Sequence, residues 1–143
     1  MRKTPLRKEG KAKISVLQRE IWKCVRPLVF HFYGRDCYTC PAKNLQGTNL
    51  QTGHVPWAKA SMSAYLKYDL RVLRPQCMRC NIHLGGQGAV AYKKMLKLEG
   101  PHYMEELEKD KNKVIQAYPH YVNLLAEYKE LLEKEGLSTP GDN

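Results

Sequence analysis

Four of the five cysteines in this chain form two Cys-x2-Cys pairs, Cys37/Cys40 and Cys77/Cys80. Each pair lets two sulfur atoms reach one ion from a tight turn, and two pairs supply the four soft ligands of a closed tetrahedral zinc site. Such an ion has no open coordination position, so we expect it to brace the fold and not to take part in chemistry. The alternative interpretations are two unrelated redox pairs or four buried thiols.

The segment between the two pairs carries a histidine that could act as a base. It is 36 residues long, which is more than an ordinary zinc ribbon has, so we expect it to fold. His54 follows Gly53 at the end of the strand-like residues 50–53. An imidazole of near-neutral pKa at that place could deprotonate a water molecule aimed at a phosphodiester.

Asn81 and His83 come directly after the second pair, where a helix is predicted to begin. A neutral amide oxygen or an imidazole there could hold a hard divalent ion, Mg2+ or Mn2+, against a phosphate. Two other interpretations stay open at this point. Asn81 could cap the helix, and His83 could contact a phosphate or face the solvent.

Positive charge is concentrated in the first hundred residues. The 143-residue chain has 24 Lys and Arg against 14 Asp and Glu; residues 1–100 hold 19 basic and 5 acidic side chains, whereas residues 101–143 hold 5 and 9. A block this basic attracts a polyanion, and beside a zinc site nucleic acid is favoured over a membrane surface or an acidic protein.

The chain has no apolar run of signal-peptide or membrane-spanning length, because its longest apolar stretch lies around residues 28–30. Five cysteines, four of them paired as metal ligands, fit a reducing compartment better than a disulfide scaffold. We therefore expect a cytoplasmic protein without a membrane partner.

The predicted elements begin with a basic arm and a helix. Residues 1–13 contain six basic side chains and no periodic apolar positions, which predicts a flexible arm. Apolar residues recur at three-and-four spacing over residues 14–32, which predicts an amphipathic helix that Pro27 should kink. Cys24 lies on its apolar face, so we expect a buried side chain and not a fifth metal ligand.

The middle of the chain is rich in turn residues and predicts a ββα arrangement with the metal at its crest. We expect strands near residues 51–55 and 70–73, separated by a loop over 57–65, and then a helix from Cys80 or Asn81.

Three further helices are predicted after this core. The first, around residues 90–96, is ended by Gly100-Pro101; the second includes Met104, Leu107 and residues 114–118; the last runs from Pro119 to Gly136. The predicted fold is α+β and mostly helical. Its parts are the arm (1–13), a zinc-braced core with its N-terminal helix (14–100), a helical extension (101–136) and a disordered tail (137–143).

The order of these motifs resembles the HNH, or ββα-metal, nucleases. The motifs are Arg35-Asp36-Cys37-x-Thr39-Cys40, Gly53-His54, Leu66-x-Tyr68-Asp69-Leu70, Gln76-Cys77-x2-Cys80-Asn81-x-His83 and Tyr92. In this detail they are similar to the lambdoid phage recombination proteins called NinG or Rap. Those proteins are structure-specific endonucleases that act on Holliday junctions and D-loops. The resemblance covers roughly residues 14–110.

The resemblance implies a role for each residue of the predicted site. His54 would be the general base, Asn81 a ligand of the catalytic Mg2+ or Mn2+, and the four cysteines the structural Zn2+ site. Asp69 stands where the family's middle asparagine usually lies and would orient His54 through a hydrogen bond. Gly53 replaces the aspartate that many HNH enzymes use as a second metal ligand, so water would complete the coordination of the ion.

Basic residues around the site are the predicted DNA contacts. They are Arg71, Arg74, Arg79, Lys93 and Lys94 beside the core, and Arg2, Lys3, Arg7 and Lys8 in the arm. The residues after the second pair, 84–88, are glycine-rich where the family would have a basic run, which leaves the phosphate contacts there open.

Three other functions and one assembly fit the same sequence. The chain could be an inert zinc module that binds nucleic acid, an HNH nuclease of another specificity, or an interaction protein that docks a partner on its last helices. Resolving a four-way junction takes two nicks, which predicts a homodimer through the helix 119–136 and its apolar stripe of Tyr121, Leu125, Tyr128 and Leu132. The alternative is that this stripe packs on the helix 14–32 of the same chain.

Overall fold

The computed structural model describes residues 3–139, and of residues 3–12 it describes the backbone alone. The chain divides into two compact units. The terminal unit comprises the chain up to Leu28 and from Ile115 onward, and the central unit comprises Val29–Val114. The predicted contact residue Arg2 lies outside the described residues, as do the side chains of Lys3, Arg7 and Lys8.

The terminal unit contains most of helix α1 (Lys3–Tyr33) and all of helix α5 (Ala117–Lys134). The helix predicted from residue 14 therefore begins earlier, at Lys3, and it continues through Pro27. Ile21, Cys24, Val25 and Leu28 are fully buried, which confirms the apolar face read from their spacing. Cys24 was predicted to be buried, and it is.

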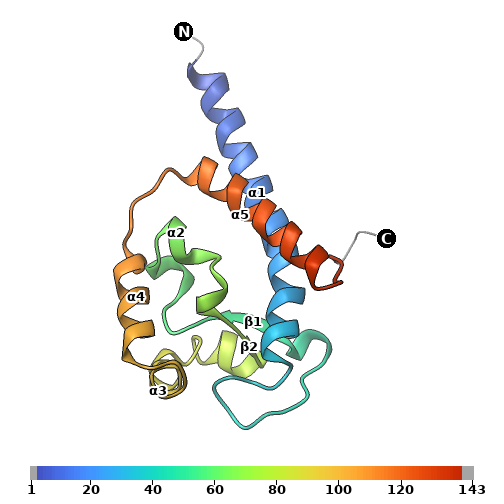
Figure 1. Cartoon of the computed structure of the whole chain (residues 1–143), viewed down its shortest axis with the longest axis vertical. Helices are drawn as coiled ribbons and strands as arrows, with labels where there is room; N and C mark the ends of the chain where they lie inside the picture. The colour runs from blue at the N-terminus through green and yellow to red at the C-terminus, as the bar shows by residue number, and fades with distance from the viewer. Residues whose placement is uncertain (1–2, 140–143) are drawn as a thin grey trace. The chain divides into compact units, whose positions relative to one another are not determined.

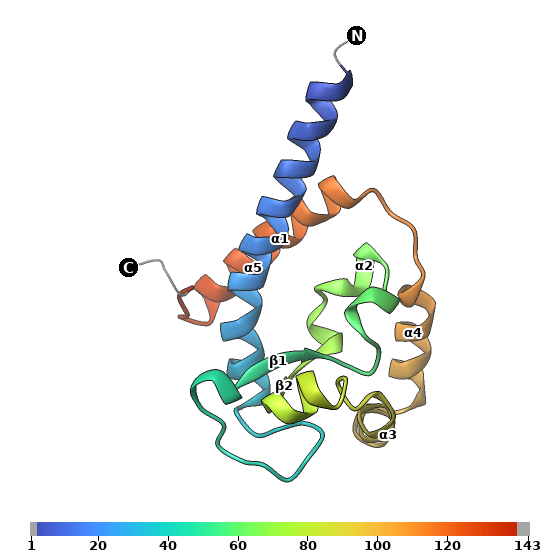
Figure 2. The ribbon, with the colours of Figure 1, turned by 180° about the vertical axis from the view of Figure 1, so that it is seen from behind.

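Helix α5 buries one side of its surface in the terminal unit. Tyr121, Leu124, Tyr128 and Leu132 recur at helical spacing and are all buried. Gln18 Nε2 of α1 donates a hydrogen bond of 3.5 Å to the Tyr121 hydroxyl, and both views show α5 crossing the middle of α1 (Figures 1 and 2). Leu125, which was predicted for this stripe, is only partly buried, and Leu124 takes its place. Of the two arrangements expected for the stripe, the structure has the one within a single chain.

The central unit is built around a two-stranded antiparallel sheet of β1 (Gln51–His54) and β2 (Leu73–Gln76). The register pairs Gln51 with Gln76 and Gly53 with Arg74. The first strand is where it was predicted, but the prediction of a strand at residues 70–73 was wrong. Residues 70–72 form a 3-10 turn, η3 (Leu70–Val72), because the Asp69 carboxylate accepts the Arg71 backbone N–H at 2.8 Å and caps the turn, so the strand begins only at Leu73.

The helix predicted to start at Cys80 is also shorter than expected. It is a five-residue π-turn, η4 (Arg79–His83), and the chain then passes through Gly85 and Gly86 at φ of +63° and +92°. Glycine adopts that left-handed backbone without a steric penalty, so the helix ends there. A new helix, α3, begins only at Gly88.

Helices α3 (Gly88–Glu99) and α4 (Pro101–Lys111) pack against each other, and the short α2 (Ala64–Lys67) packs against α4 (Figure 1). Gly100 ends α3 at φ +91° and Pro101 starts α4, as predicted. The helical prediction for residues 114–118 was wrong over 114–116, which belong to no helix or strand. Two more 3-10 turns, η1 (Gly47–Asn49) and η2 (Lys59–Ser61), complete the unit.

The described residues thus form an α+β fold that is mostly helical with one small sheet, as the sequence predicted. No helix among residues 3–139 combines the length and apolar character needed to cross a bilayer.

Candidate functional site

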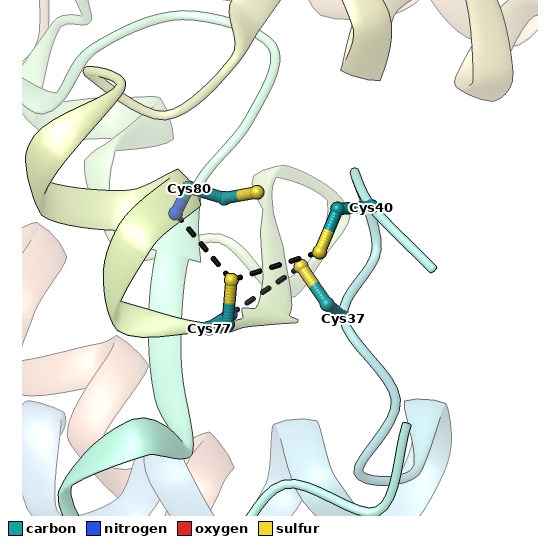
Figure 3. A group of neighbouring side chains, drawn as sticks. All are labelled: Cys37, Cys40, Cys77 and Cys80. Atoms are coloured by element: carbon teal, nitrogen blue, oxygen red, sulfur yellow. Dashed lines mark hydrogen bonds between the residues drawn. The ribbon is translucent and has the colours of Figure 1, made fainter. Parts of the chain in front are cut away.

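The four paired cysteines converge in the central unit. One ligand atom from each of Cys37, Cys40, Cys77 and Cys80 lies within 4.8 Å of all the others, and Cys40 Sγ is 3.7 Å from Cys77 Sγ (Figure 3). Four sulfurs at about 2.3 Å from a tetrahedral zinc ion are about 3.8 Å apart. The spacing and the soft donor set therefore fit a structural zinc ion, held by two segments that the sheet brings together.

Backbone N–H groups surround the sulfurs of this four-cysteine cluster. Cys77 N donates to Cys37 Sγ at 3.3 Å, Cys80 N to Cys77 Sγ at 3.4 Å and Ala42 N to Cys40 Sγ at 3.5 Å. Leu45 and Leu50 are buried beside the cluster. Donors of this kind stabilise negative sulfur, and the apolar shell excludes water from it.

The thiols of the cluster differ in acidity. Burial raises the pKa of Cys37, but the N–H groups of Cys77 and Thr39 outweigh burial and bring that pKa to about 6. Burial raises the pKa of Cys80 to about 12. A divalent cation supplies the positive charge needed to hold four thiolates together, so ion binding and loss of thiol protons are coupled here.

His54 ends β1 and is largely buried, with its Nε2 3.0 Å from the carbonyl oxygen of Lys67. A carbonyl only accepts, so Nε2 carries the proton and the lone pair of the neutral ring is on Nδ1. Burial, helped by the charges of Lys59 and Lys67, lowers the pKa of His54 to about 4. The imidazole is therefore neutral at neutral pH, which is the form that can accept a proton.

Asp69 has a different partner from the one the resemblance implied. Its carboxylate accepts two hydrogen bonds from the Arg71 guanidinium, at 3.0 and 2.9 Å, besides the backbone bond of η3. Arg71 also contacts Asp110 at 2.9 Å. The Nε2 of His54 is held instead by a backbone carbonyl two residues before Asp69, so Asp69 shapes the turn that leads into β2.

Asn81 lies on η4, next to β1. Its Nδ2 donates to Gln51 Oε1 at 2.9 Å, and its Oδ1 lies 3.0 Å from the place that a Cβ atom on Gly53 would occupy. The side chain is therefore directed across β1 and does not cap the turn, whose N-cap is Met78. The structure brings Asn81 to the residue that precedes His54, while His83 is on the same turn with an exposed side chain.

The predicted DNA contacts fall into two groups. Arg79, Lys93 and Lys94 are exposed, and Lys94 Nζ donates to the Tyr38 carbonyl at 3.0 Å. Arg74 is only 1% exposed, so its assignment as a DNA contact was wrong. Arg71 is two-thirds covered and paired with two carboxylates, so it contributes little free positive charge.

Arg74 is instead part of the interior of the central unit. Its Nη1 donates to the carbonyl oxygens of Leu70, Arg71 and Leu73 at 3.1, 3.2 and 2.9 Å, and its Nη2 donates to the Tyr103 hydroxyl at 3.3 Å. The guanidinium lies 3.9 Å from the centroid of the Tyr33 ring. Carbonyl dipoles and an aromatic face thus take the place of a carboxylate.

Two side chains in the site had no role in the sequence analysis. Gln76 is fully buried at the end of β2, and Thr39 is 7% exposed within the first cysteine pair. A polar residue next to a cysteine pair, at the end of a strand, is the only signal the sequence offers for Gln76. The Lys67 carbonyl that holds His54 has no side-chain signature at all.

Comparison of this chain with protein-family models, with curated proteins and with solved structures finds no match.

Proposed function

We propose that this chain is a metal-dependent endonuclease that acts on DNA. The observation that supports the proposal best is that Asn81 on η4 lies beside Gly53, the residue that precedes a neutral, hydrogen-bonded His54, in the unit that holds the four-cysteine cluster. A preorganised base beside a neutral oxygen donor is what one-metal hydrolysis of a phosphodiester needs. The substrate class, branched recombination intermediates of a phage, follows from the resemblance to the NinG/Rap family.

The proposed roles are those that the resemblance implies, and the geometry of each group supports them as follows. His54 Nδ1 accepts the proton of the attacking water, while the Lys67 carbonyl keeps the ring in the required tautomer. Asn81 Oδ1, with His83 as the second candidate, would hold Mg2+ or Mn2+. A divalent ion there would offset the charge on the phosphate and on the leaving 3′ oxygen, so the product would carry a 5′ phosphate.

DNA binding in this proposal relies on exposed basic side chains. Arg79, Lys93 and Lys94 remain the candidates in the central unit, together with the basic residues of the N-terminal segment 1–13. If that segment contacts phosphates, its deletion should weaken binding to all DNA shapes alike and reduce the salt slope by about one for each lost contact.

The proposal is tested with a labelled four-way junction, a D-loop and a linear duplex, each with Mg2+ or Mn2+. We expect the protein to nick the branched substrates, and His54→Ala to slow the reaction by about 10²- to 10⁴-fold while DNA affinity stays nearly the same. His102→Ala, which changes an exposed histidine of α4, is the control and should cleave normally. Binding without cleavage by the wild-type protein would favour the inert nucleic-acid-binding module.

Two nicks on opposed strands need two sites, so a homodimer on the junction is part of this proposal. Because the α5 stripe is buried within one chain, the dimer would use another surface. Light scattering with and without junction DNA measures this, and a monomer under both conditions would reject the dimer.

A further inference from the structure

Gln76 has the most unusual hydrogen bonding of the buried side chains near the candidate site. It is the last residue of β2, it directly precedes Cys77, and it is 0% exposed. Its amide nitrogen makes two hydrogen bonds, whereas its amide oxygen is buried and accepts none in the part of the chain that the structure describes. Buried polar atoms nearly always have partners, so this one calls for an explanation.

The nitrogen end of Gln76 ties together the two segments that carry the cysteines. Nε2 donates to Thr39 Oγ1 at 2.9 Å and to the Gly86 carbonyl at 2.8 Å. Thr39 Oγ1 lies 3.7 Å from Cys37 Sγ, and the Gly86 N–H bonds the Cys80 carbonyl at 2.7 Å. Since the Gly86 carbonyl can only accept, the amide cannot be flipped, and its oxygen must point the other way.

The oxygen end of Gln76 points at the candidate site. Oε1 lies 1.8 Å from the position that a Cβ atom on Gly53 would take, and Asn81 Oδ1 lies 3.0 Å from the same position. The amide oxygen thus rests on the Cα of Gly53, where only a weak C–H···O contact is available. Only glycine can be accommodated here, because a methyl group would collide with a side chain that two hydrogen bonds hold in place.

We propose that Gln76 is a positioning residue that sets the distance between His54 on β1 and Asn81 on η4. It acts through Gly53 and Asn81, and its bonds to Thr39 and Gly86 make that distance depend on the folded four-cysteine cluster. The inference rests on the proposed function for its effect on cleavage, but its effect on Asn81 does not need cleavage to be observed. A misplacement of about 1 Å at a reacting centre can cost about 10²-fold in rate.

The test uses Gln76→Met, which keeps the length of the side chain and removes both polar ends. We expect one zinc per chain and junction affinity in Ca2+ within about twofold of wild type. We also expect kcat to fall by about tenfold or more and half-saturating Mg2+ to rise by about threefold or more. Gln46→Met, which changes an exposed glutamine of the same unit, is the matched control and should leave all four quantities unchanged.

A second measurement separates this inference from the proposed function. In NMR spectra of zinc-bound protein, the side-chain NH2 of Asn81 and the Gly53 amide should shift in Gln76→Met and not in Gln46→Met. A folded Gln76→Met with unchanged Asn81 and Gly53 resonances, or with unchanged kcat and Mg2+ dependence, would overturn the proposal. If the wild-type protein cleaves no DNA, the proposed function fails and the resonances still decide the role of Gln76.

Gly53→Ala covers the case in which Gln76→Met does not fold. It leaves the Gln76 residue in place but places a methyl group where Oε1 lies, so the amide must shift away from Gly53. We expect the same pattern of retained zinc, shifted Asn81 resonances and reduced kcat. A folded Gly53→Ala protein that cleaves at the wild-type rate would contradict the proposal.

Discussion

The interiors of the two units of this molecule are stabilised by different kinds of interaction. The terminal unit buries apolar side chains that recur at helical spacing on α1 and α5. The central unit buries a four-cysteine cluster, the amide of Gln76 and the guanidinium of Arg74 beside its apolar core. Its sheet has two strands of four residues each, which is too small to be stable alone in water. Polar and metal-ligating groups therefore add to the stability of the central unit, whereas the terminal unit is stabilised by apolar packing.

Removal of zinc should show the difference in stability between the two units most clearly. We expect chelation, or Cys77→Ser, to unfold the central unit, because zinc held by four cysteines contributes on the order of 10 kcal/mol to folding. Hydrogen exchange should then show lost protection in β1 and β2, while far-UV circular dichroism keeps a helical signal from α1 and α5. Cys24→Ser changes the buried cysteine outside the cluster and should still bind one zinc. Protein purified without chelator that contains no zinc would contradict this prediction.

Arg74 and Arg79 have the same side chain, but we expect their replacement to change the free energy of unfolding by very different amounts. Arg74→Ala leaves three carbonyl oxygens and an aromatic face without their partner, so we expect a loss of about 3–5 kcal/mol in the free energy of unfolding. Arg79→Ala removes an exposed side chain and should change stability by less than about 0.5 kcal/mol. Urea unfolding measures both. Equal stabilities of the two variants would show that Arg74 is not a structural residue.

The apolar packing of the terminal unit can be weakened without touching the metal. Leu132→Ala should cost about 2–4 kcal/mol, because the side chain is 4% exposed and its loss leaves a cavity. Val122 is 40% exposed on the same helix, and Val122→Ala is the control, with an expected change below about 1 kcal/mol. Zinc content should be unchanged in both proteins. Loss of zinc from Leu132→Ala would mean that the two units do not fold separately.

The smallest effect concerns the charge of His54. Its pKa is about 4 in the folded chain and about 6.5 when unfolded, so the unfolded chain binds more protons between these values. Stability should therefore fall as the pH drops from about 6.5 to 4, by at most about 3 kcal/mol from this residue alone. Urea unfolding of wild type and His54→Gln over this range measures the difference. His102→Gln should keep the wild-type slope, and an equal slope in His54→Gln would refute the assignment.

The parts of the fold that could be predicted from sequence are those marked by a regular spacing of residues or by the backbone preferences of glycine and proline. The cysteine pairs, the stripe of α5 and the Gly100-Pro101 boundary between α3 and α4 were predicted on these grounds. The second strand was misplaced because the Asp69 side chain accepts the backbone N–H of Arg71 and turns residues 70–72 away from the sheet. Arg74 was taken for a surface residue because the carbonyl oxygens and the tyrosine that surround it come from positions with no distinctive sequence pattern.

The candidate site was predictable only in part, for a similar reason. His54 and Asn81 could be selected by residue type and by their place beside the cysteine pairs. The contacts that orient them come from the Lys67 carbonyl, the amide of Gln51 and the missing side chain of Gly53. Backbone atoms and an absent Cβ leave no trace in a search for chemistry-bearing side chains.

The 36 residues between Cys40 and Cys77 also bear on the order in which the chain folds. Closing a loop of that length costs about 3 kcal/mol of chain entropy beyond a constant term. Pairing of β1 with β2 closes a shorter loop nested inside it, with His54 opposite Leu73, and so brings the two cysteine pairs within reach of each other. We therefore expect the hairpin to precede capture of the ion. In stopped-flow refolding, the rate of zinc uptake should therefore stop rising at high zinc concentration, where hairpin formation limits it. A variant that forms the hairpin more slowly should have a lower limiting rate.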